Sequence, residues 1–147
     1  MSQDALWPEP PADLIVNCDG GSRGNPGPAA FGVSIQRPDG AEIEAIGETI
    51  GIATNNVAEY TAVIVGLKRC AALGARAVHV RSDSQLLIEQ LSGRYKVKNE
   101  TLKKLHAEAI EAAKAFERVT YEHVRREQNV RADELVNIAL DATGSED

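Results

Sequence analysis

The feature that most constrains the fold is a glycine- and proline-rich segment that follows directly after an apolar run. Residues 14–16 are Leu, Ile and Val, and the sequence DGGSRGNPGP runs from Asp19 to Pro28. The apolar run predicts a buried strand over residues 14–19 that ends on a carboxylate. Glycines lack the side chains that would keep a ligand away, so this segment suits a loop close to a phosphodiester chain. A simple glycine turn between two strands is an equally good interpretation at this point.

Two common phosphate-binding loops do not match this segment. Dinucleotide-binding loops need glycines two and then three residues apart, and P-loops end in Gly-Lys followed by Ser or Thr. Neither spacing occurs among the glycines at positions 20, 21, 24 and 27. We therefore interpret Asp19 as a residue that meets a metal ion and a nucleic-acid backbone.

The composition is typical of one globular domain. The 147 residues are 43% hydrophobic and 26% charged, and no apolar run approaches the roughly 20 residues needed to span a membrane. Residues 1–12 lack the basic start and apolar core of a secretion signal and predict a disordered lead. We expect one domain over residues 13–142, a disordered acidic tail over 143–147, and a cytoplasmic protein without a membrane partner. Cys18 and Cys70 lack C-x-x-C spacing and predict buried, reduced thiols.

The formal net charge of −6 argues against binding nucleic acid through overall charge. Two local clusters are basic. The first comprises Arg94, Lys96, Lys98, Lys103 and Lys104 beside Glu100, and the second comprises Arg125, Arg126 and Arg131 beside Glu127. Charge runs of this kind are more often solvated surfaces than binding sites, so charge alone leaves both interpretations open.

Hydrophobic spacing predicts three strands followed by alternating helices and strands. The expected strands cover residues 14–19, 29–36, 41–50, 77–83 and 118–124; the expected helices carry apolar stripes at 57–71, 84–91, 102–116 and 130–142. Short loops join the first three strands, which favours antiparallel pairing there, whereas helical crossovers favour parallel pairing later. The sequence therefore predicts an α/β fold with a five-stranded mixed sheet flanked by helices.

Four acidic residues lie at the ends of these predicted elements. Asp19 and Asp83 each end a strand, while Glu59 and Asp133 each fall in the first turn of a helix. Open α/β sheets place their sites at such ends. The four positions together predict a site with several carboxylates.

Each helix-associated carboxylate also has a local explanation. Glu59 with Asn56 would form a capping pair, and Asp83 would cap the helix that begins near Ser84. Asp133 would favour the positive end of its helix dipole, with Asn129 as the cap. Taken singly, we would favour these helix-capping roles.

Convergence of the four carboxylates would require compensation of their charge. Two like charges about 4 Å apart repel by roughly 4 kcal/mol at an effective dielectric constant near 20. Either some pKa values rise or divalent cations bind. Oxygen-only ligands favour Mg²⁺ first and Mn²⁺ second, and make zinc a poor candidate.

Four segments in order resemble type I ribonuclease H. They are DGGSRGNPGP, TNNVAEYTAVIVGL, SDSQLLIEQLSG and REQNVRADELVNIAL, spread from residue 19 to residue 140. The resemblance implies the ribonuclease H-like fold, with Asp19, Glu59, Asp83 and Asp133 as catalytic, metal-binding carboxylates. It implies an endoribonuclease that uses two Mg²⁺ ions, or Mn²⁺ as a substitute, to cut the RNA strand of RNA/DNA hybrids. The expected products carry 5′-phosphate and 3′-hydroxyl ends, and the expected state is a monomer without an obligate protein partner.

The same resemblance implies substrate-binding residues. Gly20, Gly21, Asn25, Glu59 and Gln85 match family positions that contact the RNA 2′-hydroxyl groups, the glycines through their amides. Thr54, Asn55 and Asn56 match the segment that contacts the DNA strand. Lys96 and Lys98 in the basic loop and Arg126 before the last helix complete the set.

The chain departs from many family members in two places. The long basic protrusion after the third carboxylate is replaced by the compact sequence GRYKVKNE. No histidine lies between Val124 and Asp133, where many members carry one for proton transfer or product release, so Arg126 or Glu127 would take that role or leave it unfilled. The resemblance is therefore closer to the subgroup that lacks the protrusion.

Three other classes of protein fit less well. An aspartate-nucleophile phosphatase needs a second aspartate two residues on, where this chain has Gly21. Transposases and junction resolvases seldom keep the DGGSRGNPGP and TNNVAEY segments together. A hybrid-binding module without activity is the remaining alternative; it would be expected to lack at least one carboxylate, and all four are present.

Overall fold

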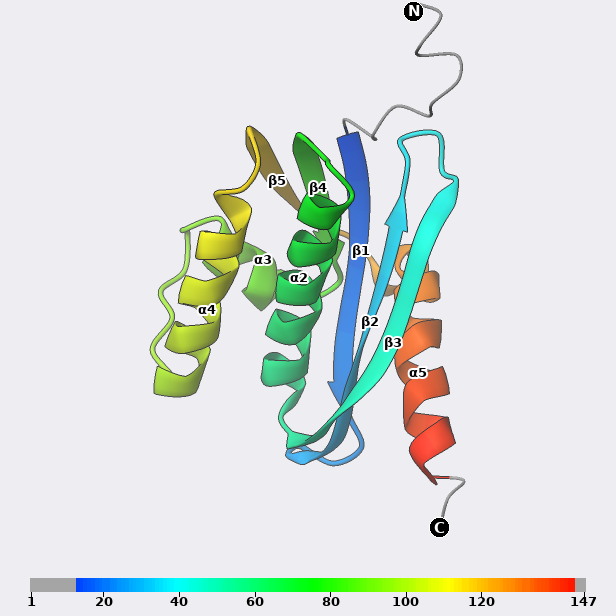
Figure 1. Ribbon diagram of the computed structural model, residues 1–147. Helices are drawn as coiled ribbons and strands as arrows, with labels where there is room; N and C mark the ends of the chain where they lie inside the picture. Colours follow the sequence, from blue (N-terminus) through cyan, green and yellow to red (C-terminus); the bar gives the residue numbers. More distant parts are fainter. Residues whose placement is uncertain (1–12, 145–147) are drawn as a thin grey trace, which may run out of the picture.

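The computed structural model describes residues 13–144, which form one sheet with helices on both faces (Figure 1). The elements are β1 (Asp13–Ser22), β2 (Gly27–Gln36), β3 (Glu42–Ala53), α2 (Asn55–Ala72), β4 (Ala77–Ser82), α3 (Gln85–Leu91), α4 (Glu100–Ala113), β5 (Arg118–His123), a short 3₁₀ turn (Arg126–Gln128) and α5 (Val130–Gly144). The predicted disordered lead and residues 145–147 of the predicted tail lie outside the described residues. None of the helices described here has the length and apolar character needed to cross a membrane.

The five-stranded mixed sheet confirms the predicted α/β architecture. The strand order is β3-β2-β1-β4-β5; β1, β2 and β3 pair antiparallel, and β1, β4 and β5 pair parallel. Tight turns can join antiparallel neighbours, whereas parallel neighbours need a crossover such as the one that α3 and α4 make between β4 and β5. Connection length therefore separates the two halves of the sheet.

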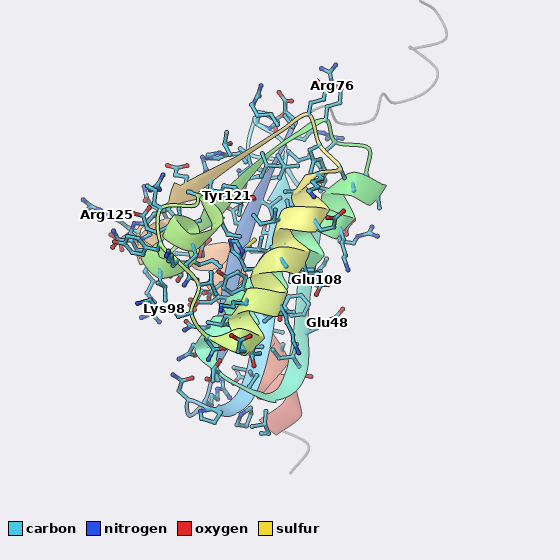
Figure 2. The ribbon with its side chains drawn as sticks, turned by 90° about the vertical axis from the view of Figure 1, so that its left-hand side faces the viewer. Glu48, Arg76, Lys98, Glu108, Tyr121 and Arg125 are labelled. Atoms are coloured by element: carbon cyan, nitrogen blue, oxygen red, sulfur yellow. The ribbon has the colours of Figure 1, made fainter. Side chains whose placement is uncertain are left out.

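The helices form two layers that enclose the sheet. α2 and α4 cover one face, and α5 lies on the other face against β2 and β3 (Figure 1). Figure 2 looks onto the first layer, with α4 in front of the sheet. The main core fills the space between this layer and the sheet; it includes Leu14, Val16 and Cys18 at alternate positions of β1. Cys18 and Cys70 are buried free thiols, as predicted.

Three glycines allow helix backbones to touch the sheet. A Cβ atom on Gly20 would lie well under 3.0 Å from the backbone of Ala58 in α2. Cβ atoms on Gly32 and Gly47 would meet the backbone of α5 in the same way, at the carbonyl oxygens of Ala132 and Leu135. Gly20 is thus first a contact point for a helix, a role that the sequence interpretation did not foresee.

Strand β1 is longer than predicted. It continues to Ser22 and pairs with β2 as far as the Ser22–Ala29 pair, so Asp19 lies within the strand and not at its end. Its parallel pairing with β4 stops earlier, at Cys18 and Ser82. The glycine segment is therefore a hairpin, and Asp19 is the first β1 residue beyond the β4 ladder.

The contact at Gly20 generates a prediction about stability. We expect Gly20→Ala to lower the free energy of unfolding by about 3 kcal/mol or more, because the added methyl group would force α2 away from β1. Gly21→Ala is the matched control, since its Cβ would have no neighbour closer than 3.9 Å. Chemical denaturation of the two variants checks this; equal stabilities would contradict the role given to Gly20.

Candidate active site

The four predicted carboxylates line one polar cleft of about 430 Å³. Its lining comprises Asp19, Gly20, Gly21, Ser22, Arg23, Asn55, Glu59, Asp83, Arg126, Asp133, Val136, Asn137 and Leu140. Five elements of the fold reach it: β1, α2, the residue after β4, the 3₁₀ turn and α5. The cleft therefore brings together residues that are up to 121 positions apart in the chain, from Asp19 to Leu140.

Strand pairing and helix packing place the carboxylates. Asp19 and Asp83 each follow the last β1–β4 pair, so the two carboxylates lie side by side where the parallel pairing of these strands ends. The backbone contact at Gly20 holds α2 close to β1 next to Glu59. Asp133 approaches from the opposite layer, on the α5 turn that packs against Gly32.

Other residues fill the capping roles that would have explained two of the carboxylates. Thr54 caps α2 by accepting from the Val57 amide at 3.2 Å, and Glu59 lies in the second turn, not in the first as predicted. Ser84, not Asp83, caps α3 by accepting from the Leu87 amide at 3.2 Å. Glu59 and Asp83 are thus free for another role.

The last helix begins differently from the predicted cap. Asp133 lies in the first turn of α5, as predicted, where its charge suits the helix dipole. The carbonyl of Asn129 accepts from the Asp133 amide at 3.1 Å. The Asn129 side chain, however, donates to the carbonyl of Cys18 at 2.8 Å and joins the helix to β1.

The electrostatics of the cleft raise two pKa values. Burial, the charges of Asp83 and Asp133, and a hydrogen bond with Asp133 raise the pKa of Asp19 to about 8, against a small opposing effect of the Gly20 amide. Burial and the charge of Asp83 raise the pKa of Glu59 to about 7, opposed by a hydrogen bond with Ser84. The unliganded cleft therefore holds protons near neutral pH, as expected of carboxylates that lack a counter-charge.

The donor set fits hard divalent cations. The carboxylates interact in pairs, Asp19 with Asp83 and Asp133, and Glu59 with Asp83. Within residues 13–144, no three His, Cys, Asp or Glu side chains are already gathered tightly enough to hold one ion. The fit rests on chemistry: all four donors are oxygens, and their mutual repulsion is what a cation would relieve.

A second pocket adjoins the cleft and receives three more predicted residues. Asn25, Thr54 and Asn56 line it together with Asn99 and Thr101, and its volume is about 490 Å³. Asn55 connects the two spaces. Its side-chain oxygen accepts from the Ser22 amide at 2.8 Å, and its own amide donates to the Asn25 side chain at 3.0 Å.

Three predicted substrate residues lie outside both spaces. Gln85 is the exposed first residue of α3, and Lys96 and Lys98 lie on the exposed loop between α3 and α4. This loop is held from beneath: the Gln90 side chain donates to the Lys96 carbonyl at 3.4 Å, and the Tyr60 hydroxyl donates to Gln90 at 2.6 Å. The side chains of Lys96 and Lys98 are therefore exposed on a loop whose backbone is hydrogen-bonded to the core at Lys96.

Four polar residues at the site were not predicted. Ser22, Arg23 and Asn137 line the cleft, and Ser84 contacts Glu59. Asn137 follows Asp133 by four residues, so helical spacing alone would have placed it on the same face. Arg23 forms an ion pair with Asp141 at 2.6 Å across the hairpin and α5, a contact that no local pattern announces.

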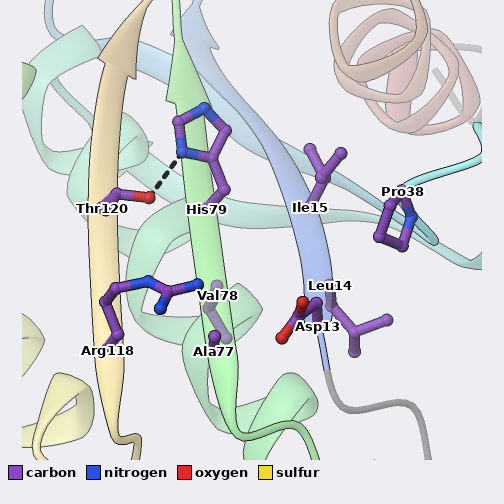
Figure 3. Close-up of a pocket in the computed structure, with 9 residues that line it drawn as sticks. All are labelled: Asp13, Leu14, Ile15, Pro38, Ala77, Val78, His79, Arg118 and Thr120. Carbon is purple, nitrogen blue, oxygen red and sulfur yellow. Dashed lines mark hydrogen bonds between the residues drawn. The ribbon is translucent and has the colours of Figure 1, made fainter.

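A separate pocket lies on the sheet beside the first residues of β1 (Figure 3). Its volume is about 350 Å³, and its lining includes Asp13, Ile15, His79, Arg118 and Thr120. The His79 ring is hydrogen-bonded to the Thr120 hydroxyl at 2.6 Å and to the Glu122 carboxylate at 2.7 Å. None of the predicted site residues lines this pocket.

Comparisons with known proteins agree with this geometry. The model of the reverse transcriptase-like family matches residues 17–139. Ribonuclease HI of Halobacterium salinarum is 44% identical over 123 residues, which cover 84% of this chain and 62% of that protein. Mycobacterial relatives, among them a bifunctional protein of Mycobacterium tuberculosis, are 47% identical over 130 residues, and the chain spans about a third of their length (36%).

Two solved structures are similar over nearly their whole length. The N-terminal RNase H domain of the Mycobacterium tuberculosis protein has a TM-score of 0.88 at 44% identity, covering 92% of this chain and 98% of that one. LC11 RNase H1 in complex with an RNA/DNA hybrid has a TM-score of 0.85 at 41% identity, covering 88% and 98%. The sheet order and helix layers described above are therefore shared with these proteins.

The raised pKa of Asp19 predicts how stability depends on pH. A carboxyl group with a higher pKa in the folded state binds more protons when folded, so stability falls as the pH rises between the unfolded value, about 4, and the folded value, about 8. Asn cannot ionise, so we expect Asp19→Asn to be more stable than wild type by roughly 1–3 kcal/mol at pH 8 without metal.

Urea unfolding in chelator at pH 5 and pH 8 checks this prediction. The advantage of Asp19→Asn should shrink at pH 5 and should be offset at pH 8 by added Mg²⁺, which would stabilise wild type more than the variant. Asp39→Asn, in the turn between β2 and β3, controls for the loss of one carboxylate. A stability difference that is constant across this pH range would contradict the assignment.

Proposed function

Because this chain belongs to the ribonuclease H family, we propose that it is an endoribonuclease that hydrolyses the RNA strand of RNA/DNA hybrids. The observation that carries the proposal is the convergence of Asp19, Glu59, Asp83 and Asp133 in one cleft. Thr54 and Ser84 cap the two helices that Glu59 and Asp83 could otherwise have capped. Asp133 lies in the first turn of α5 and in the cleft at the same time. A hybrid-bound relative of the same fold supports the choice of substrate.

In this proposal the four carboxylates hold two Mg²⁺ ions, with Mn²⁺ as a substitute. Such a pair of ions, when bound, supplies an activated water nucleophile and stabilises the leaving oxygen, which gives 5′-phosphate and 3′-hydroxyl ends. Asp19 and Glu59 carry protons near neutral pH in the unliganded cleft, so they must release them to act as ligands. The Ser84 hydroxyl favours the ionised form of Glu59 and prepares it for this role.

Recognition of the hybrid is proposed to extend from the cleft to the adjoining pocket. Gly20 and Gly21 border the cleft, and their lack of side chains would let the RNA backbone approach. Asn25, Glu59 and Gln85 would contact RNA 2′-hydroxyl groups. Thr54, Asn55 and Asn56 would contact the DNA strand, and Asn55 already bridges the two spaces.

Arg126 is proposed to serve where many family members carry a loop histidine. It lines the cleft, whereas its neighbour Glu127 does not. A guanidinium group stays charged at all relevant pH values, so Arg126 would bind a phosphate oxygen and would not transfer a proton. We further propose that the protein acts as a cytoplasmic monomer without an obligate protein partner.

The direct test is a cleavage assay with labelled RNA/DNA hybrid, the matching single-stranded RNA, and duplex DNA, each with Mg²⁺, Mn²⁺ or excess chelator. We expect metal-dependent cleavage of the RNA strand of the hybrid alone, with products that a 3′-hydroxyl-dependent polymerase can extend. A folded protein that binds the hybrid without cutting it under any metal would instead be a binding module.

The first prediction about catalytic activity concerns Asp19. We expect Asp19→Asn to reduce kcat by at least about 10³-fold while the protein stays folded, because an amide cannot replace the charged ligand. Asp39→Asn should retain wild-type turnover. Wild-type turnover in Asp19→Asn would overturn the site assignment.

The basic loop gives a second prediction. We expect Lys96→Ala combined with Lys98→Ala to raise KM several-fold and to change kcat less, because exposed cations add to the binding of phosphates without touching the cleft. Lys68→Ala with Lys114→Ala makes the same change in net charge on α2 and at the end of α4. If both pairs change KM equally at moderate salt, Lys96 and Lys98 are ordinary solvated residues.

A further inference from the structure

Asn129 joins the two segments that carry Asp19 and Asp133. It lies directly before α5, and only 1% of its surface is exposed. Its side-chain Nδ2 donates to the carbonyl oxygen of Cys18 at 2.8 Å, a contact between residues 111 positions apart. Cys18 directly precedes Asp19, so this bond ends one residue away from a carboxylate of the cleft.

The backbone of Asn129 makes the second connection. Its carbonyl oxygen accepts from the Asp133 amide at 3.1 Å and closes the first turn of α5. One buried residue is thus bonded through its side chain to β1 and through its backbone to the residue that approaches Asp19 from the opposite layer. The side chains of Asp19 and Asp133 both line the cleft and interact there.

A buried asparagine is a costly way to fill this position. Within the described part of the chain, the Oδ1 atom of Asn129 is buried without a hydrogen-bond partner, which costs about 1–3 kcal/mol. An apolar side chain of similar volume would avoid that cost. The amide donor therefore does something that packing alone does not require.

We propose that Asn129 is a positioning residue that fixes Asp133 against Asp19 and thereby sets the affinity of this carboxylate pair for Mg²⁺. Carboxylates must be ionised to act as Mg²⁺ ligands, and two ionised carboxylates repel, so the pair tends to separate unless the backbone segments that carry it are tied together. The tie from Asn129 to Cys18 resists this separation, because it anchors the start of α5 to β1. The inference rests on the proposed function only in taking Asp19 and Asp133 as Mg²⁺ ligands.

The test compares two buried asparagines that are each changed to leucine. Asn129→Leu removes the tie and also the unpartnered oxygen, so folding should be retained. Asn17→Leu is the matched control, because Asn17 is also buried on β1. Its side-chain amide donates to Ser34 and Gln36 of β2, at 3.3 Å and 3.0 Å, and not to a segment that carries a carboxylate of the cleft. Calorimetric titration with Mg²⁺ at pH 8 should show a Kd at least about 10-fold higher for Asn129→Leu, and a change under twofold for Asn17→Leu.

A second variant and a kinetic measurement separate positioning from general damage. Asn129→Asp keeps the volume of the side chain and loses the amide donor, so it should raise the Mg²⁺ Kd as well. At saturating Mg²⁺, KM for the hybrid should stay within twofold of wild type in both Asn129 variants. An unchanged Mg²⁺ Kd in either folded Asn129 variant, or an equal increase in Asn17→Leu, would overturn the inference.

The outcome is independent of the cleavage assay. If wild type binds Mg²⁺ but does not cut the hybrid, the proposed function fails, and a weaker Mg²⁺ affinity in the Asn129 variants would still support the positioning role. If wild type cuts the hybrid and the Asn129 variants bind Mg²⁺ normally, the positioning role fails alone.

Discussion

The close contact of helix backbones with the sheet is the constraint on which the site depends. At Gly20 the backbone of α2 lies where any other residue would place its Cβ atom, and α5 makes the same kind of contact at Gly32 and Gly47. Where side chains separate two packed layers, the backbones of the layers lie about 10 Å apart, as in stacked sheets. Because both helices lie this close to the sheet, Glu59 on α2 and Asp133 on α5 can reach the cleft that Asp19 lines. The glycines therefore act on the chemistry indirectly, because they set how near each helix comes.

The same convergence makes the unliganded cleft unfavourable. Burial and mutual repulsion raise the pKa of Asp19 to about 8 and that of Glu59 to about 7, so charging the cleft opposes folding. Sites that hold unfavourable charge persist only when the surrounding structure holds them in place. Here the β1–β4 ladder places Asp19 and Asp83, the α2 contact places Glu59, and the bond from Asn129 to Cys18 ties the start of the helix that carries Asp133 to β1. A cation would relieve the repulsion that remains.

How much of this could be read from the sequence depends on whether a feature is local. The order of strands and helices along the chain, the mixed sheet and the four acidic positions of the cleft were predictable, because hydrophobic periodicity and short motifs indicate them. The end of β1 was not: Asp19 looked like a strand end because glycines follow it, yet pairing with β2 carries the strand on to Ser22. The role of Gly20 and the tie from Asn129 to Cys18 also escaped, since each depends on a partner 38 or more positions away in the chain. Tertiary contacts of this kind leave no periodic trace.

The hairpin that follows Asp19 connects the acidic cleft to the adjoining pocket through hydrogen bonds. Ser22 borders the cleft and donates to the Asn55 side chain, and the backbone amide of Asn55 donates to the Asn25 side chain in the adjoining pocket. Asn55 is also the first residue of α2, the helix that carries Glu59 one turn further on. A strand bound in the adjoining pocket would therefore press on the same short network that borders the carboxylates. A duplex whose two backbones match the separation of the two spaces would engage both without disturbing that network, whereas a single strand would engage one space and leave the other to solvent. In the proposed function, each space would receive one strand of the hybrid, and one hairpin and one helix start connect the two spaces.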